Sequence, residues 1–279
     1  MTADKDRLAR TVFFLSDRTG ITAETLGHSL LTQFNGIDFQ RITVPFIDSP
    51  DKAREAVGRI NEATRRSGVR PLVFSTLVDD EIRNIIHTAE GFCLDFFDAF
   101  IGPLERELRT PSSHAAGRAH GAHDLKNYTR RIDAMNFALS SDDGINPKHY
   151  GDADVILVGV SRTGKTPTCL YLALHYGINA ANCPLTEDDL ERGRFSPTLD
   201  PHREKLFGLT IEPSRLQGIR QERRPDTRYA STRQVHYEVK EAEAMLRKHR
   251  ISYVDTTHYS VEEIATTVLQ EAGLRRSLH

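Results

Sequence analysis

The feature that most constrains this chain is a glycine-bracketed segment at residues 159–166, Gly-Val-Ser-Arg-Thr-Gly-Lys-Thr. It follows the G-x-x-x-x-G-K-[ST] pattern of a phosphate-binding loop. A chain of this length would contain the pattern by chance with a probability of roughly 1%. An apolar, β-prone run at 155–158 precedes the segment, and a helix-compatible run at 170–174 follows it. We therefore expect a strand, a loop and a helix in that order.

Each part of this loop has a chemical task. The two glycines permit backbone conformations that a Cβ would forbid, so that consecutive N–H groups can point at one anion beside a helix N-terminus. Lys165 would reach the terminal phosphoryl oxygens as a catalytic charge, and Thr166 would place its hydroxyl on Mg²⁺. The candidate nucleotide-binding residues are Gly159, Val160, Ser161, Arg162, Thr163, Gly164, Lys165 and Thr166. The alternative is a tight turn that binds no ligand.

Phosphoryl transfer also needs a carboxylate, either to hold Mg²⁺ or to accept the proton of the attacking hydroxyl. Asp255 ends a β-prone run, and Asp142 and Asp143 precede the loop in the sequence. Three more acids follow the loop: Glu187, Asp188 and Asp189. For each of these acids taken alone, a solvated surface carboxylate is the competing interpretation.

Strand-like and helix-like segments alternate along the chain. Strands are expected near 11–15, 39–47, 72–77, 155–158, 205–211 and 251–255. Helices are expected near 21–34, 53–66, 81–89, 125–140, 235–250 and 261–272. This alternation indicates βαβ units and parallel sheets, hence an α/β fold. We expect an N-terminal βαβ-type domain over residues 1–109, a linker and helix over 110–150, and a P-loop kinase-like nucleotide-binding domain over 151–279.

Charge and cysteine content narrow the class of protein. The chain has 37 Lys and Arg against 39 Asp and Glu, which argues against a general nucleic-acid or membrane-surface binder. No apolar stretch approaches the ~20 residues of a membrane span, and the run at 12–15 is too short for a signal segment. Three scattered cysteines, Cys93, Cys169 and Cys183, argue against a disulfide framework. We expect a cytoplasmic protein that binds neither membrane nor nucleic acid.

Three further features each have two interpretations. The arginine-rich segment 215–233 suits phosphoryl transfer or docking of a phosphorylated partner, or it is a solvated helix face. His114, His120 and His123 could bind a metal, although a solvated loop is favoured because no cysteine or carboxylate cage accompanies them. The turn at 16–20 could hold a second anion at a helix start, or it is a plain turn.

Longer motifs that span nearly the whole chain resemble the pyruvate, phosphate/water dikinase regulatory protein family. In that family the phosphoenolpyruvate synthase regulatory proteins form one branch. The motifs that carry the resemblance are 16–24, 68–74, 141–144, the loop 159–166, 205–211, 228–231 and 259–265. Their common order along the chain makes this resemblance more specific than the loop alone.

The resemblance implies a bifunctional enzyme. One activity would transfer the β-phosphoryl group of ADP to a threonine of phosphoenolpyruvate synthase and inactivate it. The other would use inorganic phosphate to remove that group, releasing pyrophosphate. The motifs at 228–231 and 259–263 favour the synthase over pyruvate, phosphate dikinase as the target. The shared Asp-Asp-Gly motif moves the preferred catalytic acids from Asp255 to Asp142 and Asp143.

Two other functions remain compatible with the sequence. A small-molecule kinase could use the same loop with ATP and would modify no protein. A non-catalytic nucleotide-sensing module could inhibit a partner by occupancy. A homodimer is also compatible with the sequence.

Overall fold

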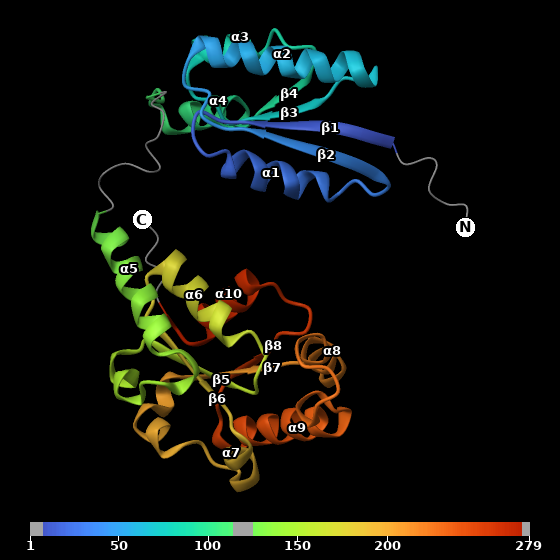
Figure 1. Cartoon of the computed structure of the whole chain (residues 1–279). Coiled ribbons are helices and arrows are strands. Elements are labelled where there is room, and N and C mark those ends of the chain that lie inside the picture. Colours follow the sequence, from blue (N-terminus) through green and yellow to red (C-terminus); the bar gives the residue numbers. More distant parts are fainter. Residues whose placement is uncertain (1–7, 114–124, 275–279) are drawn as a thin grey trace, which may run out of the picture. The chain divides into compact units, whose positions relative to one another are not determined.

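The structure, a computed structural model, describes residues 8–113 and 125–274. The chain divides into two compact units, Met1–Gly121 and Ala122–His279. Each unit contains a four-stranded parallel sheet flanked by helices, which confirms the expected α/β class (Figure 1). The division lies within the segment 110–150 that we expected to connect the domains. The histidines His114, His120 and His123 lie outside the described residues.

The first unit is a sheet of order β2-β1-β3-β4. Its strands are β1 (Leu8–Leu15), β2 (Ile37–Val44), β3 (Leu72–Ser75) and β4 (Phe92–Asp95). Its helices are α1 (Ile21–Leu31), α2 (Pro50–Ser67), α3 (Asp80–Ile86) and α4 (Phe96–Leu108). Two separate apolar clusters lie on the two faces of this sheet, with α2 and α3 on one face and α1 on the other (Figure 1).

The second unit repeats this arrangement with the order β6-β5-β7-β8. Its strands are β5 (Val155–Gly159), β6 (Ala180–Pro184), β7 (Leu206–Thr210) and β8 (Tyr253–Asp255). On one face lie α5 (Leu125–Ser140), α6 (Lys165–Tyr176) and α10 (Val261–Glu271). On the other lie α7 (Glu187–Arg192), α8 (Pro213–Arg223) and α9 (Thr232–His249). The long helix expected ahead of the loop thus packs within this unit.

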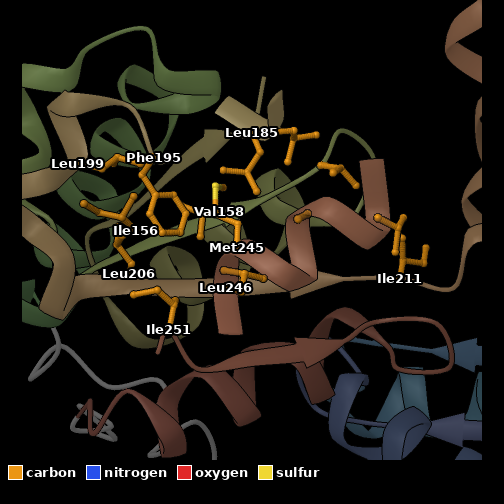
Figure 2. Packing of buried hydrophobic residues seen from close by; sticks show 14 of the residues in the cluster. Ile156, Val158, Leu185, Phe195, Leu199, Leu206, Ile211, Met245, Leu246 and Ile251 are labelled. Atoms are coloured by element: carbon orange, nitrogen blue, oxygen red, sulfur yellow. The ribbon is translucent and has the colours of Figure 1, made fainter. Parts of the chain in front are cut away.

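Strand β5 lies inside the sheet and is covered on both faces. Its residues alternate between two apolar clusters, as side chains of a strand must. Ile156 and Val158 pack in the cluster that contains Met245 of α9 (Figure 2), whereas Val155 and Leu157 pack in the cluster that contains α6. This burial explains the continuous apolar run in the sequence. It also holds the segment that follows β5 at the carboxyl edge of the sheet, where ligands of such folds bind.

Several element boundaries differ from the expected ones for local reasons. Strand β2 ends at Val44 and not at 47, because Pro45 has no N–H for the ladder. Strand β7 begins at Leu206, since residues 197–205 form a 3₁₀ segment. Strands β4 and β6 were not expected. Each is only four or five residues long, and β6 contains no β-branched residue.

Helix α10 begins as expected. Ser260 is its N-cap, and Ser260 and Glu263 form a reciprocal capping box. Within residues 8–113 and 125–274, no helix combines the length and the apolar character needed to cross a membrane.

Candidate functional site

The glycine-bracketed segment connects a buried strand to a helix. Strand β5 ends at Gly159, and helix α6 begins at Lys165 with Gly164 as its N-cap residue. The strand and helix expected around the motif are therefore present. Helix α6 ends at Tyr176, and the next residue, Gly177, has a φ of 62° and donates its N–H to the carbonyl of Ala173. Because no side chain caps its first turn, the helix presents free N–H groups at the loop.

The two glycines of the motif are required for different structural reasons. A Cβ on Gly159 would lie 2.2 Å from the carbonyl oxygen of Leu209, so only glycine fits against β7. Gly164 has a φ of 89°, and a Cβ there would meet no atom within 4 Å. The left-handed backbone therefore explains why position 164 is a glycine, and the space around this residue stays open. An open space in front of helix N–H groups suits a phosphate.

Lys165 is almost completely buried beneath this loop. Its Nζ donates hydrogen bonds to the carbonyl oxygens of Gly159, at 2.9 Å, and Val160, at 2.8 Å. Burial lowers the pKa of Lys165 to about 8, and the negative charge of Asp143 opposes this shift. The ammonium group is therefore held at the loop and has lost part of its hydration.

Thr166, Asp142 and Asn182 meet beside the first turn of α6. The Thr166 hydroxyl donates to Asp142 Oδ1 at 2.9 Å. The Asn182 amide also donates to this carboxylate oxygen, and it lies 3.3 Å from Thr166 Oγ1. The structure thus joins the residue expected to contact Mg²⁺ with one of the two preferred acids, although 24 positions separate them in the sequence.

Asp143 lies in a 3₁₀ turn, Asp142–Gly144, that is docked on β6. Its φ of 48° is unusual for a residue other than glycine. The turn is held by two hydrogen bonds to Asn182: Asp143 N donates to Asn182 Oδ1 at 3.0 Å, and Asn182 N donates to Ser141 O at 3.3 Å. The Asp143 carboxylate forms no hydrogen bond to a residue that the structure describes. It is exposed, and its charge acts on Lys165.

Asn182 is the site residue that sequence reasoning missed. Its side chain is 1% exposed and contacts both halves of the Asp142–Asp143 pair. A buried amide in a strand next to the loop strand would have been a usable signal. That strand, β6, has too little β-propensity to be recognised from the sequence.

The other candidate acids have different partners. Asp255 ends the edge strand β8, two strands away from β5, and accepts hydrogen bonds from Thr257. Asp189 caps α7 together with Thr186. Asp188 pairs with Arg192 at 3.0 Å, and Glu187 pairs with Arg228.

The arginine-rich segment divides into one buried and several exposed residues. Arg220 is completely buried and pairs with Glu238 at 2.7 Å. The exposed side chains are Arg215, Arg223, Arg224, Arg228 and Arg233. Neither a fully solvated helix face nor a purely functional cluster describes the whole segment.

The oxygen groups beside the first turn of α6 are of a type that could hold a magnesium ion. Mg²⁺ is commonly held by one or two carboxylates together with substrate phosphates, and it retains several waters. The Asp142 carboxylate and the Thr166 hydroxyl, which lie 2.9 Å apart, are oxygen groups of this kind. Within residues 8–113 and 125–274, no group of three or more His, Cys, Asp or Glu residues could hold a metal by itself. Any Mg²⁺ here would therefore depend on the phosphates for further ligands.

Known proteins are similar to this chain over most of its length. The model of the kinase/pyrophosphorylase family matches residues 12–269. A protein of Alkalilimnicola ehrlichii is 58% identical over 270 residues, covering 97% of this chain and 98% of its own. A protein of Marinobacter nauticus is 55% identical over 269 residues, covering 96% of this chain and 99% of its own. Both have the provisional name phosphoenolpyruvate synthase regulatory protein. This chain therefore belongs to the kinase/pyrophosphorylase family.

Proposed function

We propose that this protein regulates phosphoenolpyruvate synthase by adding and removing a phosphoryl group on a threonine of that enzyme. ADP would be the phosphoryl donor for inactivation, and inorganic phosphate would be the acceptor for reactivation. The names of the relatives support the target. The observation that carries the chemistry is the cluster of Lys165, Thr166 and Asp142 at the N-terminus of α6.

The loop would serve as a P-loop, and the second unit as a P-loop kinase-like domain. The N–H groups at the start of α6 and the Lys165 ammonium would bind the phosphates of ADP. Thr166 and Asp142 would hold Mg²⁺, which when bound neutralises charge on the phosphoryl oxygens. Asn182 would orient the Asp142 carboxylate for this role through its amide hydrogen bond.

Asp143 is the better candidate for the general base. Asp142 already accepts hydrogen bonds from Thr166 and Asn182, whereas the Asp143 carboxylate is exposed. In the forward direction, Asp143 would take the proton of the target threonine hydroxyl as its oxygen attacks the β-phosphorus of ADP. The bond between that phosphorus and the bridging oxygen breaks, and AMP leaves.

The reverse activity would use the same groups. An oxygen of inorganic phosphate attacks the phosphorus of phosphothreonine, the bond to the threonine oxygen breaks, and pyrophosphate forms. Asp143 would take a proton from the attacking inorganic phosphate and pass it to the departing threonine oxygen. Inorganic phosphate and the β-phosphate of ADP are both tetrahedral anions, so one phosphate cradle can receive either.

Intact-mass analysis tests this proposal. Purified protein is incubated with ADP, Mg²⁺ and phosphoenolpyruvate synthase, and inorganic phosphate is added afterwards. We expect the synthase to gain one phosphoryl group and then lose it with release of pyrophosphate. A synthase mass that never changes would refute the proposal. The same incubation with pyruvate, phosphate dikinase in place of the synthase tests that enzyme as the target. An incubation with metabolites and ATP, without a protein substrate, tests for a small-molecule kinase.

Two matched variants separate the acids. Asp143→Asn should lower transfer by at least about 10²-fold, because the proton acceptor is lost. Asp142→Asn should instead raise the Mg²⁺ concentration needed for half-maximal transfer. Transfer within threefold of wild type for Asp143→Asn would move the base elsewhere.

A further inference from the structure

We propose that Arg220 and Tyr229 are positioning residues that hold the phosphate-binding loop at Ser161 in its binding conformation. The proposal rests on the nucleotide-binding role of the loop given above. It concerns two residues that lie outside the glycine-bracketed motif and more than 50 positions after it. Arg220 belongs to the arginine-rich segment 215–233 and Tyr229 to the motif 228–231, but the sequence assigned neither residue a contact with the loop.

Arg220 places a full positive charge inside the second unit, behind the loop. Its side chain is 0% exposed. The guanidinium donates to Glu238 Oε2 at 2.7 Å, to the Tyr229 carbonyl at 3.0 Å and to the Ser161 carbonyl at 3.1 Å. One rigid planar group therefore connects α8, α9, the segment before α9 and the loop.

Tyr229 contacts both Arg220 and the loop. The Arg220 Cζ atom lies 4.1 Å from the centroid of the Tyr229 ring, which is a cation–π arrangement. The Tyr229 hydroxyl is 2.9 Å from Ser161 Oγ. Ser161 is therefore held twice, at its carbonyl by Arg220 and at its side chain by Tyr229.

Fixing the Ser161 carbonyl also fixes the next N–H group. The peptide bond is planar and trans, so the Arg162 N–H points away from Arg220, opposite to the Ser161 carbonyl. Arg162 has a φ of 76°, a left-handed conformation that costs about 1–2 kcal/mol for a residue other than glycine. Left-handed residues in such turns direct successive N–H groups toward one anion. The contacts at Ser161 oppose relaxation of this strained turn.

Stability alone does not account for this arrangement. A buried Arg–Glu pair usually contributes no more to stability than apolar residues of similar volume, because both charges lose their hydration. Arg220 and Glu238 could link α8 and α9 equally well without any contact to the loop. The contacts to Ser161 are therefore the part that points to ligand binding.

Tyr229→Phe is the sharpest test, because it removes only the hydroxyl and keeps the ring beneath Arg220. We expect ADP to bind about 3- to 10-fold more weakly by calorimetry, as one hydrogen bond is lost. The melting temperature should fall by no more than about 6 °C, because one hydrogen bond contributes about 0.5–1.5 kcal/mol to stability. Without ligand, the amides of residues 161–163 should exchange hydrogen faster. Tyr253→Phe is the matched control, since its hydroxyl accepts from Arg247 at 3.2 Å elsewhere in this unit.

Arg220→Lys is the second variant. Lysine keeps a charge for Glu238, but a single ammonium group cannot reproduce the guanidinium fork that reaches two carbonyls. We expect a loss of ADP affinity of about 10-fold or more. Phosphate and pyrophosphate should be affected in the same direction.

The outcomes separate this proposal from the function on which it rests. Unchanged amide exchange and unchanged ADP affinity in Tyr229→Phe would overturn the positioning role. A lowered melting temperature with normal ADP affinity would show a purely structural role and overturn it as well. If wild-type protein binds no ADP, the proposed function fails, and faster exchange in Tyr229→Phe would still show that Tyr229 holds the loop.

Discussion

Asn182→Ala should disrupt the candidate site although Asn182 lies outside the loop. The side chain is 1% exposed and connects Asp142, Asp143 and Thr166. Its loss removes an amide hydrogen bond to a carboxylate, which contributes about 1.5–3 kcal/mol. It also removes the acceptor for the Asp143 N–H, worth about 0.5–1.5 kcal/mol. Water that enters the space left by the amide would restore part of this hydrogen-bond energy, so we expect a destabilisation of about 2–3 kcal/mol.

Two measurements check this magnitude. For a unit of roughly 150 residues, 1 kcal/mol shifts the melting temperature by about 2–4 °C, so the transition of the second unit should fall by about 4–12 °C. Transfer to the synthase, measured where the variant is still folded, should fall by about 10- to 100-fold, because both acids lose the group that orients them.

Asn179→Ala is the matched control. This residue precedes β6, the strand that contains Asn182, and its amide donates to the Asp152 carbonyl at 3.2 Å. Its loss should cost about 0.5–1.5 kcal/mol and leave transfer within twofold. The reasoning would be refuted if Asn182→Ala melted within about 2 °C of wild type and retained transfer within threefold. Asn182 would then contribute neither to the stability of the second unit nor to the orientation of the two acids.

Three further predictions follow from single observations. Burial lowers the pKa of Lys165 to about 8, so the ammonium form is present below that pH and lost above it. ADP affinity should therefore fall between pH 7.5 and about 9.5. A calorimetric ADP affinity that does not change over this pH range would contradict this prediction. Gly159→Ala should lower the melting temperature sharply because its Cβ would lie 2.2 Å from a backbone oxygen, whereas Gly218→Ala, inside α8 with open space, should stabilise by about 0.5–1 kcal/mol. The double change Arg223→Ala and Arg224→Ala should raise the KM for the protein substrate and leave ADP affinity unchanged, if these exposed arginines dock the partner.

Local patterns predicted the fold where each signal lies within a few neighbouring residues. The strands with continuous apolar runs, such as β5, were identified because burial on both faces demands such a run. The helix expected near 261–272 was identified from its local pattern, and the structure has α10 at Val261–Glu271. Strands β4 and β6 were missed, because their short sequences carry little β-propensity and they exist through pairing with β3 and β5.

The choice between the candidate acids also could not be made from local sequence patterns. From the residues alone Asp255 was the preferred acid, and the family resemblance moved that preference to Asp142 and Asp143. The tertiary structure adds a physical distinction. Asp142 contacts Thr166, whereas Asp255 ends an edge strand separated from β5 by β7. No local pattern contains this information, because these contacts connect residues far apart in the chain.

The glycine-bracketed loop was determined by the sequence itself, since its backbone conformation depends on glycines at fixed positions and on the strand and helix that flank it. The surroundings of the loop were decided only by tertiary structure. Asn182 reaches it through pairing of β6 with β5, and Arg220 reaches it by packing of α8 behind Ser161. The physical reason is that a turn is a short-range property of the backbone. A buried amide or guanidinium acquires its role from whichever distant groups the fold places within hydrogen-bonding distance.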